Sequence, residues 1–213
     1  MLDFLFTDPT LFLILGLALL VAITIHEFAH ALAADQLGDP TPRLQGRLTL
    51  NPFAHLDPLG TLMLVIIGFG WGKPVQFDPF NLKNPRRDAA IISFAGPLSN
   101  IALASILSII LRFATTPFSP APLIIITSYF ISFNVTLAVF NLLPIHPLDG
   151  GKILVGLLPP KEAHEVDMFM QRYGMIILLL LIFPVFGGVS LVSNIISPIR
   201  NILLNIYFPQ NLI

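Results

Sequence analysis

The chain has 213 residues, of which 55% are hydrophobic and 11% charged, and its mean hydropathy is +0.84. Since soluble domains carry about 25% charged residues, this composition is typical of an integral membrane protein. The formal net charge of −1 argues against a nucleic-acid partner, and the lack of cysteine excludes disulfides and thiolate metal sites. The length suits one membrane-embedded domain over residues 1–213, with no separate soluble domain.

Four segments are apolar enough to predict spanning helices, which need about 20 residues each. They cover roughly residues 9–34, 88–111, 122–143 and 174–193, with a kink expected at Pro184 in the last. The first is expected to be retained rather than cleaved, because Asp3 and Asp8 stand where a signal peptide has Lys or Arg. Residues 197–213 could form an interfacial helix or a half-span. We therefore predict an all-α polytopic membrane protein with about four to six transmembrane helices.

Between the first two spans, residues 36–87 predict a re-entrant and strand-containing loop. Residues 59–69 are apolar but too short to cross a bilayer, which favours a re-entrant segment. Residues 43–50 and 73–80 have strand character and predict a small β-hairpin or sheet on the cytoplasmic side. Strand edges are not tolerated facing lipid, so these segments should lie at the interface or line a wet cavity. Further along, residues 160–174 predict a polar surface helix.

The basic residues predict the orientation of the chain. With four spans, nine of the eleven Lys and Arg residues fall on one side of the membrane, while Arg112 and Arg200 fall on the other. Cytoplasmic loops are enriched in Lys and Arg. We therefore expect a multi-pass protein, in the plasma membrane, with loops 35–87 and 144–173 in the cytoplasm.

The first span ends in His26-Glu27-Phe28-Ala29-His30, an H-E-x-x-H pattern. Residues four apart share one face of a helix, so the two imidazoles can bind one metal ion, with Glu27 beside it as a general base. The pattern also occurs by chance, but ionisable groups at membrane depth are functional by default. Residues 1–42 contain no Lys or Arg that could neutralise Glu27, so a divalent cation is the better explanation.

A catalytic zinc ion needs a third protein ligand and one open position. His55, His146 and Asp149 are the plausible candidates. Asp149 follows the third span in "FNLLPIHPLDGG", residues 140–151, where two prolines break the helix. Non-helical backbone at membrane depth is tolerated only where it lines a cavity.

The combination of H-E-x-x-H in an early span with N-x-x-P-x-x-x-L-D-G in a later one resembles the site-2 protease family of intramembrane zinc metalloproteases. The segments "NPFAHLDPLGTL" (51–62), "GWGKPV" (70–75) and "FAGPLSN" (94–100) are similar to that family as well. The likeness covers roughly residues 20–155. It implies one Zn²⁺ per chain held by His26, His30 and Asp149, with Glu27 as the general base.

The resemblance also implies residues that bind the substrate. Asn141 would hold substrate backbone near the metal, and Asn100 would face the same cleft. The stretch from Val75 through Phe77 to residue 80 would offer an edge strand to an unwound substrate. This last role has a physical basis too, because proteases act on extended chains and strand addition exposes the scissile amide.

Two histidines have open roles. His146 stands where the family commonly has proline; it could be a fourth ligand, a hydrogen-bond partner of Asp149 or, as we favour, a solvated loop residue. His55 could orient a metal ligand, but a hydrogen bond within its own turn-rich loop is the favoured interpretation.

The leading hypothesis is a peptidase that cleaves within or near a transmembrane segment of a membrane protein, using zinc-activated water. Its partners would be a transmembrane protein or peptide, the lipid bilayer and, in a homo-oligomer, a second copy of the chain. A metal or proton transporter using the same His, Glu and Asp groups is the alternative, although transporters often have repeated halves and the sequence shows none. A catalytically silent membrane binder is a third, weaker hypothesis.

Overall fold

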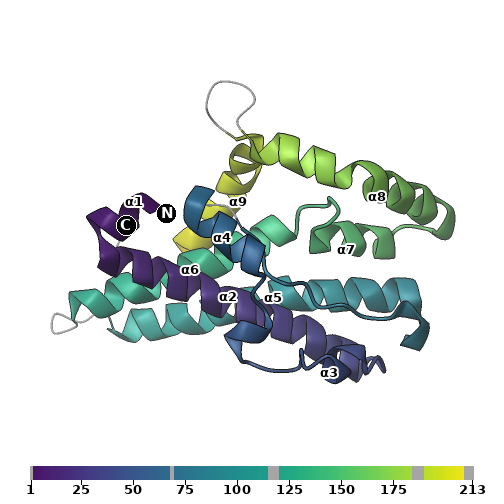
Figure 1. Cartoon of the computed structure of the whole chain (residues 1–213), viewed down its shortest axis with the longest axis horizontal. Helices are drawn as coiled ribbons and strands as arrows, with labels where there is room; N and C mark the ends of the chain where they lie inside the picture. The colour runs from purple at the N-terminus through teal and green to yellow at the C-terminus, as the bar shows by residue number, and fades with distance from the viewer. Residues whose placement is uncertain (1, 68–69, 115–119, 184–189, 209–213) are drawn as a thin grey trace.

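A computed structural model describes residues 2–67, 70–114, 120–183 and 190–208. The described residues form helices and connecting segments, and none of them belongs to a β-strand. The helices, labelled in Figure 1, are α1 (Leu2–Thr7), α2 (Pro9–Gln36), α3 (Thr41–Leu44), η1 (Pro52–Ala54), α4 (Pro58–Ile67), η2 (Pro79–Asn81), α5 (Pro85–Ala114), α6 (Ala121–Asn141), α7 (Asp149–Leu157), α8 (Pro160–Ile182) and α9 (Leu191–Tyr207).

Within the described residues, three helices are long and apolar enough to cross a membrane: α2, α5 up to Phe113, and α6. These correspond to the first three predicted spans. The three pack on one another. Helix α7 packs against α5, and α9 packs mainly against α6. At the start of α2, Asp8 accepts a hydrogen bond from the Leu11 N–H at 2.9 Å, and Pro9 takes the first helical position.

The predicted fourth span, residues 174–193, is not confirmed. Residues 160–182 instead form the single helix α8, which joins the predicted polar helix to the first part of that span without a break. The expected kink at Pro184 lies outside the described residues. The tail forms α9, which packs against α6 and α8. Figure 1 shows α7 and α8 lying side by side, with α7 next to α5.

The chain after α2 folds back along α2, and its re-entry into a membrane stays a prediction. The ten-residue helix α4 contacts α1, which precedes α2 in the chain. On the return path, Gly72 lies so close to Ile23 that an added Cβ would stand 3.0 Å from its side chain. The segment therefore reaches the middle of α2 before it runs back toward α5 (Figure 1).

The predicted β-hairpin is absent from the part of the chain that the structure describes. Residues 41–44 form helix α3, and one isolated bridge joins Leu56 to Gly72. Residues 73–78 belong to no helix or strand, and two of their backbone N–H groups pair with carboxylate side chains. Glu27 accepts from the Val75 N–H at 2.9 Å, and Asp39 accepts from the Asp78 N–H at 2.7 Å. Among the described residues, the N–H groups of Gln76 and Phe77 have no partner, so this stretch can pair with another chain. We call residues 73–78 the strap.

Candidate metal centre

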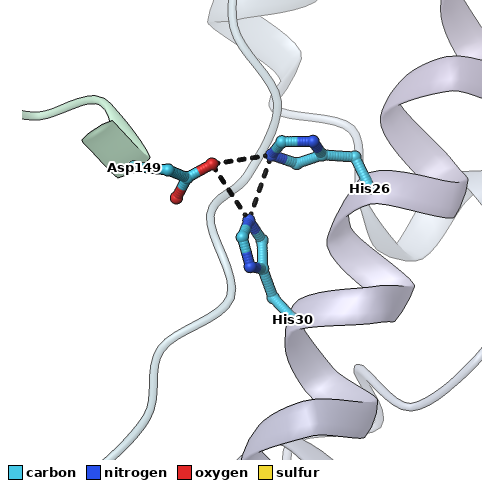
Figure 2. A group of neighbouring side chains, drawn as sticks. All are labelled: His26, His30 and Asp149. Carbon is cyan, nitrogen blue, oxygen red and sulfur yellow. Dashed lines mark hydrogen bonds and ion pairs between the residues drawn. The ribbon is translucent and has the colours of Figure 1, made fainter. Parts of the chain in front are cut away.

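Three side chains from two distant parts of the sequence meet at one point, as Figure 2 shows. His26 Nε2 lies 3.0 Å from His30 Nε2 and 3.0 Å from Asp149 Oδ2, and His30 Nε2 lies 3.3 Å from the same oxygen. Both histidines are buried on α2, four residues apart, so one helix face presents both rings. The structure thus brings together the first two predicted ligands and one of the three candidates for the third.

Asp149 reaches this point because it is the first residue of α7, after the chain leaves α6. Helix α7 packs against α5, and Gly150 allows the necessary close approach to the preceding loop. A Cβ at Gly150 would stand 2.2 Å from the Leu143 carbonyl oxygen, which is far inside van der Waals contact. Gly150 does not have a positive φ, so its small size serves close packing here rather than an unusual backbone conformation.

Hydrogen bonds behind the two rings fix their tautomers. His26 Nδ1 lies 2.7 Å from Asn100 Oδ1, and His30 Nδ1 lies 2.7 Å from the Ile92 carbonyl oxygen. Both partners are acceptors, so each Nδ1 carries the proton and donates it. Each Nε2 is then left with a lone pair directed at the other ring and at Asp149. Metal-bound histidines have this arrangement, in which the second ring nitrogen donates to a carbonyl or carboxylate.

The three ligand atoms suit a tetrahedral ion. Zinc bonds to nitrogen and oxygen of about 2.0–2.1 Å place neighbouring tetrahedral ligands roughly 3.3 Å apart, close to the observed 3.0–3.3 Å separations. Asp149 Oδ2 is buried, and no group in the described residues donates a hydrogen bond to it. Two imine lone pairs and a carboxylate oxygen this close together repel one another unless a cation lies between them. These residues therefore fit a zinc ion.

Glu27 borders the metal centre and contacts the strap. Its Oε2 accepts from the Val75 N–H at 2.9 Å and lies 4.0 Å from Arg47 Nη2. The same guanidinium donates to the Lys73 carbonyl, so Arg47 joins the carboxylate to the strap. Burial lowers the pKa of Arg47, and the negative charge of Glu27 acts in the opposite direction. Glu27 thus has a nearby cation from beyond residue 42, which the sequence argument did not consider.

Gly96 on α5 lies directly against the rings of His26 and His30. A Cβ there would stand 2.4 Å from His30 Nε2 and 2.7 Å from His26 Cε1. The glycine belongs to the segment "FAGPLSN", in which sequence analysis singled out only Asn100. The spacing of glycine and asparagine gives no sign that the helix must lie directly against the metal ligands.

The residues predicted to bind substrate are spread around the centre. Asn100 is fully buried behind His26, where it holds a ligand rather than facing open space. Val75 lies on the strap against Glu27, and the Phe77 ring lies 4.8 Å from Lys152 Nζ. Asn141 donates to the Leu137 carbonyl of its own helix at 3.0 Å. Their roles toward a substrate stay predictions.

The two remaining histidines lie apart from the three ligand atoms. His55 is fully buried, and its Nε2 pairs with the Thr49 carbonyl oxygen at 2.8 Å, within its own loop. His146 is half-buried in the loop before α7. Burial lowers its pKa, and the positive charge of Lys152 lowers it further, against the opposing charge of Asp167. In the described residues, the group of side chains able to share a metal contains only His26, His30 and Asp149.

Sequence reasoning also missed Asn134 on α6, which is fully buried. Its Oδ1 accepts from Asn100 Nδ2 at 2.8 Å, which connects α6 to the residue behind His26. Neither Asn134 nor Arg47 belongs to the motifs that drew attention to the site. A buried asparagine in an apolar span was the one available signal, because such a group needs a partner.

The fold and the site together define a membrane-embedded helical metalloprotein with a His, His, Asp centre and an adjacent glutamate. Comparison with known proteins identifies the family of the chain. The family model described as peptidase family M50 matches residues 119–182. The chain is 39% identical over 192 residues to YwhC of Bacillus subtilis strain 168, which is named as a zinc metalloprotease, and the match covers 87% of each chain. The chain belongs to peptidase family M50, the site-2 protease family.

Other relatives agree with this assignment. Rip2 of Mycobacterium tuberculosis H37Rv, also named as a zinc metalloprotease, is 33% identical, with 79% of this chain and 66% of Rip2 covered. Stage IV sporulation protein FB of Bacillus subtilis strain 168 is 30% identical, with 71% and 54% covered. No solved structure gives a significant match.

Proposed function

We propose that this chain is an intramembrane zinc endopeptidase, which hydrolyses a peptide bond within or near a transmembrane segment of a membrane protein. The observation that carries the proposal is the convergence of three acceptor atoms, from His26, His30 and Asp149, beside the carboxylate of Glu27. The names of the relatives as zinc metalloproteases support it. We further propose one Zn²⁺ per chain and a multi-pass plasma-membrane protein with loops 35–87 and 144–173 in the cytoplasm.

His26, His30 and Asp149 would hold the zinc ion. When bound, zinc polarises the scissile carbonyl and lowers the pKa of a water molecule. Glu27 takes the proton from the attacking water and delivers it to the leaving amine. Its Oε2 already accepts a bond from the Val75 N–H, so Oε1 is the oxygen available to the water.

The strap offers a place for an extended substrate. It belongs to no helix, it has no partner strand among the described residues, and the dihedrals of Asp78 at its end are extended. A substrate chain that pairs with it would lie next to Glu27, because Val75 contacts that residue. The backbone of Val75 and Phe77 would then pair with the substrate chain, and Asn141 would bind the substrate backbone from the end of α6.

The test uses the full chain, purified in detergent, and measures both its zinc content and its cleavage of a transmembrane peptide. Glu27→Gln should keep wild-type zinc content and lose cleavage by at least about 100-fold. Asp149→Ala should lose zinc and cleavage together, because two imidazoles alone hold the ion weakly. Cleavage by Glu27→Gln at the wild-type rate, or full zinc content in Asp149→Ala, would refute the proposed division of roles.

A second measurement, in liposomes, tests the transporter alternative. The wild-type protein should cleave the peptide there, and its metal and proton flux should be no greater than that of Glu27→Gln. The family assignment does not favour transport, and flux without cleavage would reverse that conclusion.

A further inference from the structure

A chain of hydrogen bonds runs through the centre of the bundle from α6 to the metal centre. Asn134 Nδ2 donates to the Phe130 carbonyl oxygen at 2.8 Å, and Asn134 Oδ1 accepts from Asn100 Nδ2 at 2.8 Å. Asn100 Nδ2 also donates to the Ala22 carbonyl oxygen at 2.9 Å, and Asn100 Oδ1 accepts from His26. Asn100 and Asn134 are fully buried, so water cannot replace any partner.

The hydrogen bonds in this series all run in one donor-to-acceptor direction, which a backbone carbonyl sets. A carbonyl oxygen can only accept, so the Phe130 carbonyl requires the amide nitrogen of Asn134 to face it. The oxygen of Asn134 must then face Asn100, whose own nitrogen has to turn toward it. This leaves the oxygen of Asn100 facing His26, which can only be met by a protonated Nδ1.

A reversed Asn100 would have the opposite effect. It would present N–H groups to His26 Nδ1, which would then act as an acceptor and leave the proton on Nε2. A protonated Nε2 cannot bind a metal ion. With Asn134 in place, that reversal would bring the oxygen of Asn100 against the oxygens of both Asn134 and Ala22, so two acceptor pairs would repel each other.

We propose that Asn134 is a positioning residue for the metal centre: together with the Ala22 carbonyl it fixes the orientation of Asn100, and it thereby favours the tautomer of His26 that can bind zinc. The inference rests on the zinc-binding role of His26 proposed above. Asn134 acts through Asn100 and touches neither the metal ligands' free nitrogens nor the substrate. It lies seven residues before Asn141, outside the motif that ends α6.

The test compares Asn134→Leu, which removes the acceptor, with Asn134→Asp, which keeps an oxygen facing Asn100. Thr136→Val is the matched control, because Thr136 bonds only to the Ser132 carbonyl of its own helix in the described network. Each full-length protein is labelled with ¹⁵N-histidine. The ring nitrogens are observed by NMR without metal, and zinc affinity is measured by competition with a chelator. The His26 signal is identified by its loss in His26→Gln.

We expect His26 to carry its proton on Nδ1 in the wild type, in Thr136→Val and in Asn134→Asp. In Asn134→Leu a substantial Nε2–H population should appear, and the zinc dissociation constant should rise about 10–100-fold, as for other partners behind metal ligands. A wild-type tautomer and zinc affinity in Asn134→Leu would overturn the proposal. An equal loss of affinity in Thr136→Val would overturn it too, because the effect would then be general to α6.

These outcomes are separate from the fate of the proposed function. If wild-type protein binds zinc through His26 but cleaves no membrane peptide, the peptidase proposal fails and the positioning role stands. If it cleaves and Asn134→Leu keeps wild-type zinc affinity, the positioning role fails alone.

Discussion

Replacing Gly96 by alanine is the most direct perturbation of the metal centre that mutates none of the proposed ligands. Gly96 lies on α5 with its Cα hydrogen against the rings of His26 and His30. The added methyl would stand 2.4 Å from His30 Nε2 and 2.5 Å from His30 Cε1, whereas ordinary contact begins at 3.4 Å. The His30 ring therefore has to retreat by about 1 Å, or α5 has to move away from α2.

Either movement should damage zinc binding. A displacement of about 1 Å can reduce catalysis by 10²-fold. The His30 ring cannot retreat without losing its 2.7 Å hydrogen bond to the Ile92 carbonyl oxygen. Alanine also favours a helix over glycine by roughly 0.5–1 kcal/mol, so the substitution should not weaken α5 itself. We therefore expect zinc affinity to fall by at least about 10-fold and cleavage by about 100-fold, with the fold retained.

The assay measures zinc content by mass spectrometry after gel filtration, cleavage of a transmembrane peptide, and the melting temperature without metal. Gly16→Ala is the matched control, because Gly16 lies in α2, the helix of both histidines, with nothing within 4 Å of the added Cβ. Gly16→Ala should equal the wild type in all three measurements. If Gly96→Ala also keeps wild-type zinc affinity and activity, the proposed packing of α5 against the rings is refuted.

Three further predictions concern the surroundings of the site. Arg47→Met should reduce cleavage by about 10-fold while zinc content stays at the wild-type level, because the strap loses its tie to Glu27; an unchanged rate would contradict this. Chelation should lower the melting temperature of the wild type but not of Asp149→Ala, since saturating zinc at 1,000 times its dissociation constant stabilises by about 4 kcal/mol; equal shifts would exclude Asp149 as a ligand. Burial alone would raise the pKa of Asp39, but four hydrogen bonds outweigh it and hold that pKa below its ordinary value. Asp39→Ala should therefore cost about 2–3 kcal/mol near pH 7, and the difference from the wild type should shrink as the pH falls below about 4 and Asp39 is protonated; a difference independent of pH in denaturation experiments would be the contrary result.

The three residues that meet at the candidate metal centre could be singled out from the sequence because their chemistry is local or motif-based. The i, i+4 spacing places His26 and His30 on one face whatever the rest of the chain does. Asp149 was one of three candidates on residue chemistry alone, and the resemblance to the site-2 protease family indicated it among them. The first three spans were equally accessible, since each is a long apolar segment.

The remaining features depend on contacts that only the folded chain creates. The strap has strand-like composition, but carboxylates of Glu27 and Asp39 take the backbone donors that a partner strand would have used. Arg47 follows α2 by eleven residues and comes back to its side only through the folded loop. Gly96 and Asn134 act across helix interfaces, and a single sequence does not show which residue faces which neighbour.

The hydrogen-bonded chain through His26, Asn100 and Asn134 crosses from α2 to α5 to α6 in an otherwise apolar interior. Apolar helices can slide past one another at little cost, whereas a buried polar pairing fixes their register. A shift of one helical turn, about 5.4 Å, would break every link in this chain at once. The polar chain therefore fixes the register of α2, α5 and α6 relative to one another, which apolar contacts alone would not do.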